Sequence, residues 1–324
     1  MSTSAPAGPA ASPGSVELRS GETKVVIVPA LGGKITSLEI AGREWLWRDP
    51  APAPRAQKQA NGAEFGATGD GGGFDECFPT IAPCTLASDT PGFGGVGLPD
   101  HGELWSRPAA LTLETRDDGV HATTEWIGER MPYRFARTVI ARGGGVEMRY
   151  RVVNEGAHPL PFIWCAHPLF PLTKQTRLII PDGTRVRLWS QRDVSLGTPG
   201  TELRWPRAVV GGKFVDLSRP FGVARSYACK LFLEPSMGHA AIEEEGARLE
   251  VSFDTTRVPY LGVWIDKGAW SLLRRGRAVR VLGMEPGIGA PDSLNEAMRT
   301  WKSAGRLEPR ESREWSVTWT GIRG

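Results

Sequence analysis

Apolar and polar side chains alternate along many short segments, and this pattern predicts a protein built mainly of β-strands. Residues 134–140 are an example, because the alternation there suits a strand with one face in water. Turn signals such as Asp117-Asp118-Gly119 separate neighbouring segments and predict hairpins. Strands are predicted at residues 16–19, 24–29, 34–40, 110–116, 120–126, 133–142, 146–153, 160–166, 185–189, 228–234, 248–253, 260–266 and 315–320.

A helical period appears in one segment, between Asp292 and Gly305. Its apolar positions, which share one face of a helix, are Leu294, Ala297, Met298 and Trp301. We expect Asp292 to cap the start of this helix and Gly305 to end it. Many strands with few helices predict an all-β fold, either a sandwich or a barrel.

The chain is predicted to form a single domain over residues 16–324, because no linker divides it. Residues 1–15 contain mainly Ala, Pro, Ser and Gly and lack the basic flank and apolar core of a signal peptide, which predicts a disordered lead. Residues 51–73 are rich in Pro, Ala and Gly and have no periodicity. They are predicted to form a long loop, and such loops are usually functional or disordered.

Composition and charge narrow the range of partners. The chain has 324 residues, of which 40% are hydrophobic and 23% charged, and its formal net charge is +3. The basic residues are spread out, so we expect no nucleic-acid partner, and no run approaches the roughly 18 apolar residues of a membrane span. The four cysteines lack the spacing of a metal site, which favours free thiols, a cytoplasmic location and no metal. They are Cys77, Cys84, Cys165 and Cys229.

Glu285 is the strongest single candidate for chemistry. It follows a mostly apolar run at residues 278–282 and precedes Pro286 and Gly287, so we expect it at the end of a strand before a tight loop. A carboxylate held at such a junction is well placed to act as a fixed base. The alternative is a glutamate in a solvated loop, which is common.

Three further motifs contain residues that could act beside Glu285. Asp75 and Glu76 lie between glycines and aromatic residues, His101 lies in a turn before Gly102, and His167 ends an apolar segment before a proline. Each also has an ordinary structural explanation. The two acids could cap a turn, His101 could bond a backbone carbonyl, and His167 could be a core histidine.

Taken together, these motifs resemble the aldose 1-epimerase (galactose mutarotase) family over residues 16–320. The resemblance lies in a His-Gly step at His101, a His-Pro step at His167 and a glutamate, Glu285, that precedes the Pro291-Asp292 step. It implies a β-supersandwich of stacked antiparallel sheets, with the site in a groove across one sheet. The implied reaction interconverts the α and β anomers of a hexose, in a monomer or homodimer, without metal or cofactor.

The resemblance also implies roles for individual side chains. His167 would protonate the ring oxygen, and Glu285 would take the proton of the C1 hydroxyl. His101 would donate a hydrogen bond to the sugar. The remaining candidates are Trp164 and Trp264 for stacking on the sugar ring, and Asp75, Glu76 and Asp266 for accepting bonds from its hydroxyls.

Two departures from the family pattern leave the substrate open. Asp75-Glu76 stands where galactose-specific members carry Asn-Arg, and the hydroxyl-binding Asp of the family has no match, since Lys230 or Glu234 occupies that region. One alternative is a non-catalytic carbohydrate-binding or regulatory protein on the same fold. Another is an epimerase for phosphorylated or otherwise anionic hexoses, with an anion clamp formed by Arg107, Arg130, Arg134 and Arg137. A polysaccharide-cleaving enzyme is disfavoured, because the chain has no room for the helical domain that such enzymes usually carry.

Overall fold

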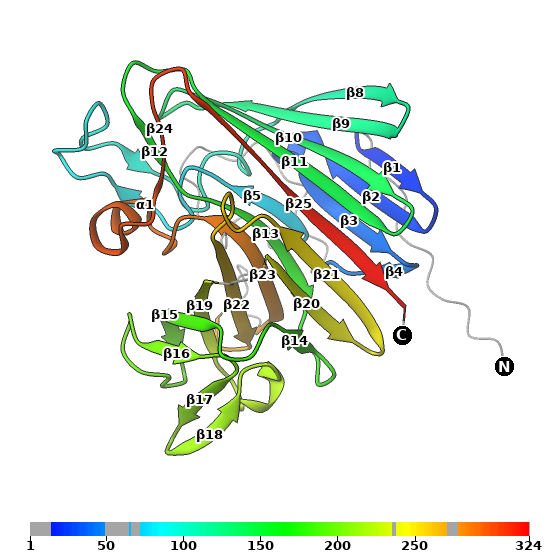
Figure 1. The fold of residues 1–324 in the computed structure, drawn as a ribbon, viewed down its shortest axis with the longest axis vertical. Coiled ribbons are helices and arrows are strands. Elements are labelled where there is room, and N and C mark those ends of the chain that lie inside the picture. The colour runs from blue at the N-terminus through cyan, green and yellow to red at the C-terminus, as the bar shows by residue number, and fades with distance from the viewer. Residues whose placement is uncertain (1–13, 49–64, 66–71, 235–237, 271–277, 324) are drawn as a thin grey trace.

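Two large antiparallel β-sheets dominate the computed structural model, which describes residues 14–48, 65, 72–234, 238–270 and 278–323 (Figure 1). The prediction of an all-β fold is thereby confirmed. Most of the predicted loop at residues 51–73 and most of the predicted lead at residues 1–15 lie outside the described residues. The division into a lead and a single domain stays a prediction. No helix in the described ranges is long and apolar enough to cross a membrane.

The larger sheet supplies the strands that matter for function. Its strands are β1 (Val16–Ser20), β2 (Thr23–Val28), β3 (Lys34–Ile40), β4 (Arg43–Glu44), β5 (Phe74–Cys77), β13 (Trp164–Pro171), β15 (Arg185–Arg192), β16 (Glu202–Arg204), β17 (Arg207–Val210), β18 (Lys213–Asp216), β19 (Ala228–Glu234), β22 (Tyr260–Lys267) and β23 (Arg280–Ile288). Their order in space is β1-β2-β3-β5-β13-β23-β22-β19-β15-β16-β17-β18, and β4 pairs with β3. Segments far apart in sequence therefore meet at β5, β13, β23, β22 and β19.

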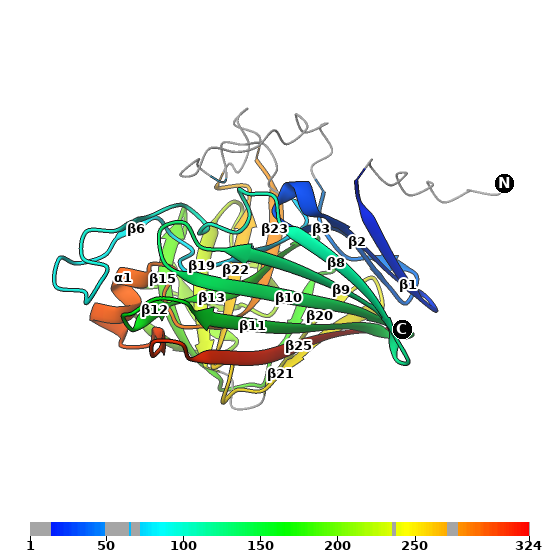
Figure 2. The same cartoon turned by 90° about the horizontal axis from the view of Figure 1, so that it is seen from above.

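The second sheet has the order β14-β20-β21-β25-β11-β10-β9-β8. Its strands are β8 (Ala110–Arg116), β9 (Gly119–Ile127), β10 (Tyr133–Arg142), β11 (Gly145–Asn154), β14 (Arg177–Ile179), β20 (His239–Glu244), β21 (Ala247–Phe253) and β25 (Ser312–Ile322). Figure 2 shows the long strands β10, β11 and β25 side by side in this layer. Two short pairs, β6 (Cys84–Thr85) with β7 (Gly97–Leu98) and β12 (Leu160–Phe162) with β24 (Gly305–Leu307), complete the strands.

Aromatic side chains join the two sheets. Tyr150 of β11 stacks on Trp315 of β25 with ring centroids 5.5 Å apart, and Trp164 of β13 lies 4.9 Å from Trp315. All three are buried. Large aromatic residues bury much apolar surface on folding, and each Å² removed from water stabilises the fold by roughly 25 cal/mol. Alternate residues of β11 and β13 therefore face a shared core.

Alternation predicted the regular strands well and the irregular ones poorly. The predicted segments 34–40, 110–116, 133–142 and 228–234 coincide with β3, β8, β10 and β19. The predicted strand 160–166 is instead divided between β12 and β13, and Asp75 lies inside β5 rather than in a loop. Residues Phe74–Cys77 are all buried, so they show no alternation that a sequence could reveal.

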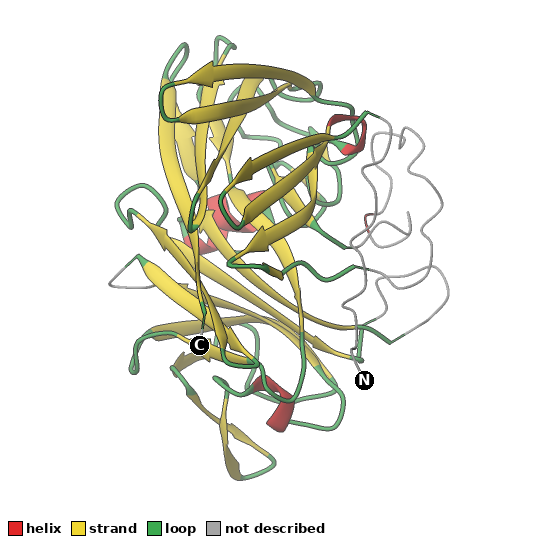
Figure 3. Ribbon diagram, turned by 90° about the vertical axis from the view of Figure 1, so that its right-hand side faces the viewer, coloured by secondary structure: helices red, strands yellow, loops and turns green. Residues whose placement is uncertain are grey.

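The predicted helix is shorter than expected and begins differently. α1 (Leu294–Glu296) is followed by a π-helical turn, η4 (Ala297–Trp301), and Figure 3 shows how little helix the fold contains. Ser293, not Asp292, caps the start, because its side chain accepts a hydrogen bond from the backbone N–H of Glu296. Short helices elsewhere in the described residues include η1 (Pro29–Leu31) and η3 (Pro220–Gly222). Asp292 is thereby free of the capping role that the sequence suggested.

Candidate active site

The register of the central strands brings His167 opposite Glu285. In the β13–β23 pairing, Cys165 lies opposite Gly287 and Leu169 opposite Gly283, and the same register places His167 against Glu285. On its other side, β13 pairs with β5, where Asp75 is the partner of His167. Residues directly opposite in adjacent strands point to the same face of a sheet. One face of the larger sheet therefore carries all three side chains.

Both prolines of the sequence motifs lie inside strands. Pro168 belongs to β13 and Pro286 to β23, so the prediction that His167 and Glu285 mark strand ends is wrong. The ladder between β13 and β23 is interrupted between Cys165 and Leu169, where both prolines lie. Proline has no N–H to donate to the neighbouring strand. Each proline therefore removes a hydrogen bond from the ladder, although the strand itself continues.

The same face continues onto β22 and β19. Glu285 lies opposite Gly262 of β22, and Trp264 of that strand lies opposite Lys230 of β19. Lys230 and Trp264 thus join His167 and Glu285 along the wall of a cavity of about 350 Å³. Small-molecule sites usually measure about 300–1,000 Å³, so the cavity suits a small ligand.

Titratable side chains inside this cavity lie close together. Nε2 of His167 lies 3.9 Å from Oε1 of Glu285, and the ammonium group of Lys230 donates a hydrogen bond to Oε2 of Glu285. Nζ of Lys230 also lies 3.4 Å from Oδ1 of Asp292. All four residues are buried. A buried carboxylate stays ionised only beside a compensating charge, and Lys230 supplies that charge to Glu285.

Two glycines leave room for the Glu285 carboxylate. A Cβ added at Gly283 would stand 2.5 Å from Oε1 of Glu285, and one at Gly262 would stand 3.2 Å from Oε2. Side chains at these positions would displace the carboxylate from its contacts with His167 and Lys230. The absence of a Cβ at both positions therefore fixes where Glu285 lies in the cavity.

Burial changes the protonation of the cavity groups in opposite directions. Burial, together with the charges of His101 and Lys230, lowers the pKa of His167 well below its usual 6.5, so its imidazole is neutral near pH 7. Burial also raises the pKa of Asp292 to about 6, although Lys230 opposes this shift. For Lys230 itself, burial would lower the pKa, but Asp292 and Glu285 outweigh it and raise the pKa. The ammonium group stays charged.

His101 reaches the cavity from a separate turn. Its Nδ1 lies 2.8 Å from Oδ1 of Asp100, and its ring stacks on Phe65 with centroids 4.0 Å apart. Burial would raise the pKa of Asp100, but its hydrogen bonds with His101 and with the Phe65 N–H lower it, so the carboxylate accepts and His101 Nδ1 donates. This leaves the other ring nitrogen of His101 for the cavity.

The glycine after His101 explains how the turn approaches β5. Phe78, directly after β5, forms an isolated bridge with Gly102. A Cβ on Gly102 would lie 2.1 Å from the Phe78 carbonyl oxygen, and Gly102 has a φ of +73°. Only glycine meets both demands easily. The His-Gly step therefore fixes His101 within a ring–ring distance of 4.9 Å from His167.

The predicted sugar-binding residues divide between the two faces of the sheet. Trp264 lines the cavity, as do His101, His167 and Glu285. Trp164 and Glu76 instead face the core between the sheets, and Nε1 of Trp164 donates to Glu76 at 2.9 Å. Neither residue lines the cavity, so the prediction that they contact a sugar there is wrong. The reason is the two-residue period of a strand, which turns Glu76 away from the face that Asp75 occupies.

Glu76 instead connects the two sheets. It lies 3.2 Å from Nη1 of Arg137 on β10 and accepts a hydrogen bond of 3.1 Å from the Tyr150 hydroxyl. Burial raises its pKa to about 7, although Arg137 and the hydrogen bonds oppose the shift. Removing one partner of such a buried pair typically costs about 3–5 kcal/mol of stability. Glu76 is thus part of the core.

Asp75 and Asp266, predicted to accept hydrogen bonds from a sugar, instead bind groups of the protein around the cavity. Asp75 pairs with Lys34 at 2.9 Å and is not among the residues that line the cavity. Oδ1 of Asp266 accepts the backbone N–H groups of Gly268, Ala269 and Trp270 at 2.9–3.1 Å. Because Trp270 lines the cavity, Asp266 positions a wall of the site.

The proposed anion clamp of four arginines does not form at this cavity. Arg137 is bound to Glu76, Arg107 lies 2.7 Å from Glu129 and Arg134 lies 2.9 Å from Glu155. The Arg130 guanidinium donates to the Gly97 carbonyl at 2.7 Å. Among the described residues that line the cavity, none is an arginine.

Several cavity residues escaped the sequence analysis. The most important is Lys230, which lies in the region where the family pattern has a hydroxyl-binding Asp. A signal was present, because Lys230 is the one charged residue within the apolar run at residues 228–233. Asp292 was assigned to the helix start. Further lining residues without a predicted role are Phe65, Asp100, Trp189 and Trp270.

The structure also brings together possible metal ligands that the sequence spacing did not reveal. Cys77, His101 and His167 each offer one ligand atom, and these three atoms all lie within 4.8 Å of one another. The four cysteines form no disulfide. The three residues come from β5, a turn and β13, so no short motif could have marked them.

Comparison with known proteins supports the fold. No family model matches the chain, and no curated protein matches it. Among solved structures, the Slr1438 protein of Synechocystis sp. PCC 6803 is similar, with a TM-score of 0.68 and 18% identity over 96% of each chain. A candidate aldose 1-epimerase from Escherichia coli K12 has a TM-score of 0.65 and 18% identity, covering 96% of this chain and 99% of its own.

A galactose mutarotase-like protein from Clostridium acetobutylicum has a TM-score of 0.63 and 14% identity, over 96% of this chain and 95% of its own. At such identities the similarity shows the fold and leaves the activity open. The chain therefore has the fold of galactose mutarotase-like proteins, and the expected architecture of antiparallel sheets is confirmed.

Proposed function

We propose that this protein is a cofactor-independent aldose 1-epimerase that interconverts the α and β anomers of a hexose. The observation that carries the proposal is the pair of His167 and Glu285, 3.9 Å apart in a cavity of about 350 Å³. Ring opening needs one group that removes the proton of the C1 hydroxyl and another that protonates the ring oxygen. The cavity offers both kinds of group together with aromatic walls.

Glu285 acts as the base. Its carboxylate is held by Lys230 on one side and accommodated by Gly283 on the other. When Glu285 takes the proton of the C1 hydroxyl, a carbonyl forms at C1, the bond from C1 to the ring oxygen breaks and the acid protonates that oxygen. The aldehyde then rotates about C1–C2, and reclosure on the other face of the carbonyl returns both protons to the groups that exchanged them.

His167 is the proposed acid, but its environment changes the expected pH dependence. Burial lowers its pKa well below 6.5, so the protonated ring is a minor species at pH 7. Catalytic hydrogen bonds often tighten only when substrate binds, and His167 is therefore kept as the proposed acid. Lys230 is the second candidate for the acid because its charged ammonium group touches Glu285.

The walls suit a neutral sugar. Trp264 and Trp270 meet edge to face with centroids 6.0 Å apart, and Trp189 also lines the cavity. Aromatic faces cover the C–H surface of a pyranose, while Asp292 and His101 offer polar contacts to hydroxyls. The Lys230 ammonium group is already paired with Glu285 and Asp292, which disfavours a strongly anionic substrate.

The test is mutarotation of freshly dissolved anomers, followed by polarimetry or exchange NMR. The panel contains glucose, galactose and their 6-phosphates. Wild-type protein should accelerate the neutral sugars, and His167→Asn should lose most of the rate while keeping the fold. A preference for the 6-phosphates would support an epimerase of anionic hexoses. Sugar binding without acceleration would instead support the carbohydrate-binding alternative.

A further inference from the structure

We propose that Cys77, His101 and His167 form a binding site for a soft transition-metal cation such as Zn²⁺, and that the bound ion inhibits the protein. The ligand atoms of the three residues all lie within 4.8 Å of one another. In a tetrahedral zinc site, neighbouring ligand atoms stand roughly 3.3–3.6 Å apart, so moderate side-chain rotations suffice. The inhibition rests on the proposed function, whereas the binding does not.

Strand register points the thiol toward the histidines. Cys77 lies opposite Cys165 in the β5–β13 pairing, two residues from Asp75, which lies opposite His167. Residues two apart on a strand share a face, so Cys77 and His167 lie on the same side of the sheet. The bridge between Phe78 and Gly102 brings the His101 turn to the end of β5. Three separate segments therefore converge on one point.

The surroundings of the two histidines resemble those of metal ligands. Oδ1 of Asp100 accepts a hydrogen bond of 2.8 Å from Nδ1 of His101. The lone pair of Nε2 is then available to coordinate a metal ion. A carboxylate behind a ligating histidine fixes its tautomer and orientation. Nδ1 of His167 is buried without a hydrogen-bond partner among the described residues. A buried imidazole nitrogen without a partner is uncommon and requires an explanation.

The choice of ion follows from the ligand set. A thiolate with two imidazoles suits Zn²⁺ or another soft transition metal rather than Mg²⁺ or Ca²⁺, which prefer oxygen ligands. Three protein ligands leave the fourth position of a tetrahedral ion open toward the cavity. When the sulfur–metal bond forms, the Cys77 thiol releases its proton to solvent. The carboxylates of Asp100, Glu285 and Asp292 in the cavity wall, and of Asp75 beside His167, outnumber the ammonium groups of Lys34 and Lys230, which favours a cation.

Inhibition follows from the shared residues. His101 and His167 both line the sugar cavity, and a bound ion would occupy ring nitrogens that face it. Zn²⁺ should therefore compete with sugar rather than destroy the protein. Cys77 does not line the cavity and has no role in the proposed reaction. It can be replaced without removing a reacting group.

Binding is tested on the full chain, without sugar, by adding Co²⁺ as a spectroscopic probe for Zn²⁺. We expect one equivalent to give the thiolate-to-cobalt absorption band and the visible bands of a tetrahedral site, both displaced by Zn²⁺. Cys77→Ser should abolish the thiolate band and weaken Zn²⁺ binding tenfold or more. Asp100→Asn should weaken it about 10–100-fold, as loss of an outer-shell partner usually does.

Cys84→Ser is the matched control, because Cys84 is a partly exposed thiol on the short strand β6. This variant should bind Co²⁺ like the wild type. The proposal is overturned if no thiolate band appears, or if Cys77→Ser keeps the band while Cys84→Ser loses it. Circular dichroism confirms that each variant is folded, and Cys77→Ala replaces Cys77→Ser if the latter is not.

Inhibition is measured separately by mutarotation with Zn²⁺ and varied sugar. A rise in KM with unchanged kcat is expected for the wild type, and Cys77→Ser should restore the rate at the same Zn²⁺ concentration. Binding without any effect on the rate would overturn the inhibitory role alone. If the protein shows no mutarotation, the spectroscopic experiment still decides whether the site exists.

Discussion

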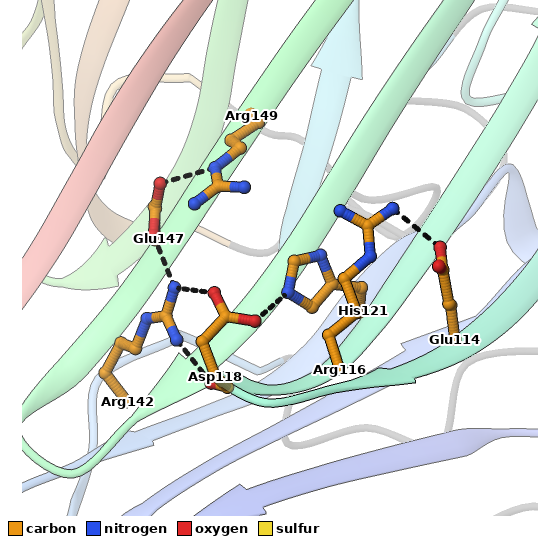
Figure 4. A network of polar contacts seen from close by, with 7 residues as sticks. All are labelled: Glu114, Arg116, Asp118, His121, Arg142, Glu147 and Arg149. Atoms are coloured by element: carbon orange, nitrogen blue, oxygen red, sulfur yellow. Dashed lines mark hydrogen bonds and ion pairs between the residues drawn. The ribbon is translucent and has the colours of Figure 1, made fainter.

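The cavity around Glu285 and the ionic network on the second sheet use the same residue types in opposite environments. In the network, Arg142 pairs with Asp118 and Glu147 at 2.8 and 2.9 Å, and Nε2 of His121 lies 2.7 Å from Oδ1 of Asp118 (Figure 4). Arg149 and Arg116 each pair with a neighbouring glutamate. The network joins β8, β9, β10 and β11 through side chains that are mostly exposed.

Burial makes the difference between the two regions. Water screens the network, and exposed pairs of this kind contribute little to stability. In the cavity, Glu285 and Lys230 are both buried, so each depends on the other for its charge. A histidine next to a carboxylate therefore indicates a functional site only when its environment is also known. His121 is itself buried but pairs with the exposed carboxylate of Asp118, whereas His167 lies beside the buried Glu285 and faces a cavity that a ligand can fill.

The largest effect is expected from Glu285→Gln. Loss of a positioned general base usually lowers the rate by about 10²–10⁴-fold, and this variant should lose on the order of a hundredfold or more in kcat. Mutarotation is measured by polarimetry, with sugar binding followed by calorimetry. Glu114→Gln removes a glutamate from the exposed network and should leave the rate unchanged. Near wild-type activity of Glu285→Gln with intact sugar binding would refute the assignment.

Lys230→Met should reduce both stability and activity. It leaves the buried carboxylates of Glu285 and Asp292 without their cation, and breaking a buried pair in this way costs about 3–5 kcal/mol. Thermal and urea unfolding give the stability, and the folded fraction is then assayed for mutarotation. Arg116→Met is the exposed counterpart, and its melting temperature should change little. Equal melting temperatures for the two variants would show that burial does not separate the regions as described.

The pH profile should distinguish the two candidate acids. A group whose pKa is lowered is protonated only below that pKa, so catalysis by protonated His167 should weaken as the pH rises from the acidic side toward 7. If Lys230 is the acid, its raised pKa keeps it protonated and no such fall is expected in this range. The measurement is kcat against pH for the wild type, with unfolding followed at each pH. A flat profile would contradict the role of His167.

Asp118→Asn should have the smallest effect. Hydrogen bonds with Arg142 and His121 lower the pKa of Asp118 to about 2, but its side chain is exposed to water. We expect mutarotation to be unchanged and the melting temperature to shift only slightly. A large loss of rate would show that the second sheet is coupled to the cavity, and the contrast between the regions would then be incomplete.

The fold class and a set of candidate reactive residues can be read from the sequence alone. Strands with one solvent-exposed face, such as β10, were recognisable because apolar and polar side chains alternate along residues 133–142. The motifs at His101, His167 and Glu285 identified side chains that the structure gathers around one cavity. Their catalytic roles stay predictions.

The side of the sheet that each residue faces, and the groups that surround it, depend on how the strands pair and pack. Glu76 and Asp75 are neighbours in sequence, yet the pleat sends Glu76 to Arg137 and Asp75 to Lys34. Lys230 lies 55 positions from Glu285 and meets it only because β22 pairs with both of their strands. Register between strands is set by the packing of the whole sheet, so no local pattern could have shown this contact.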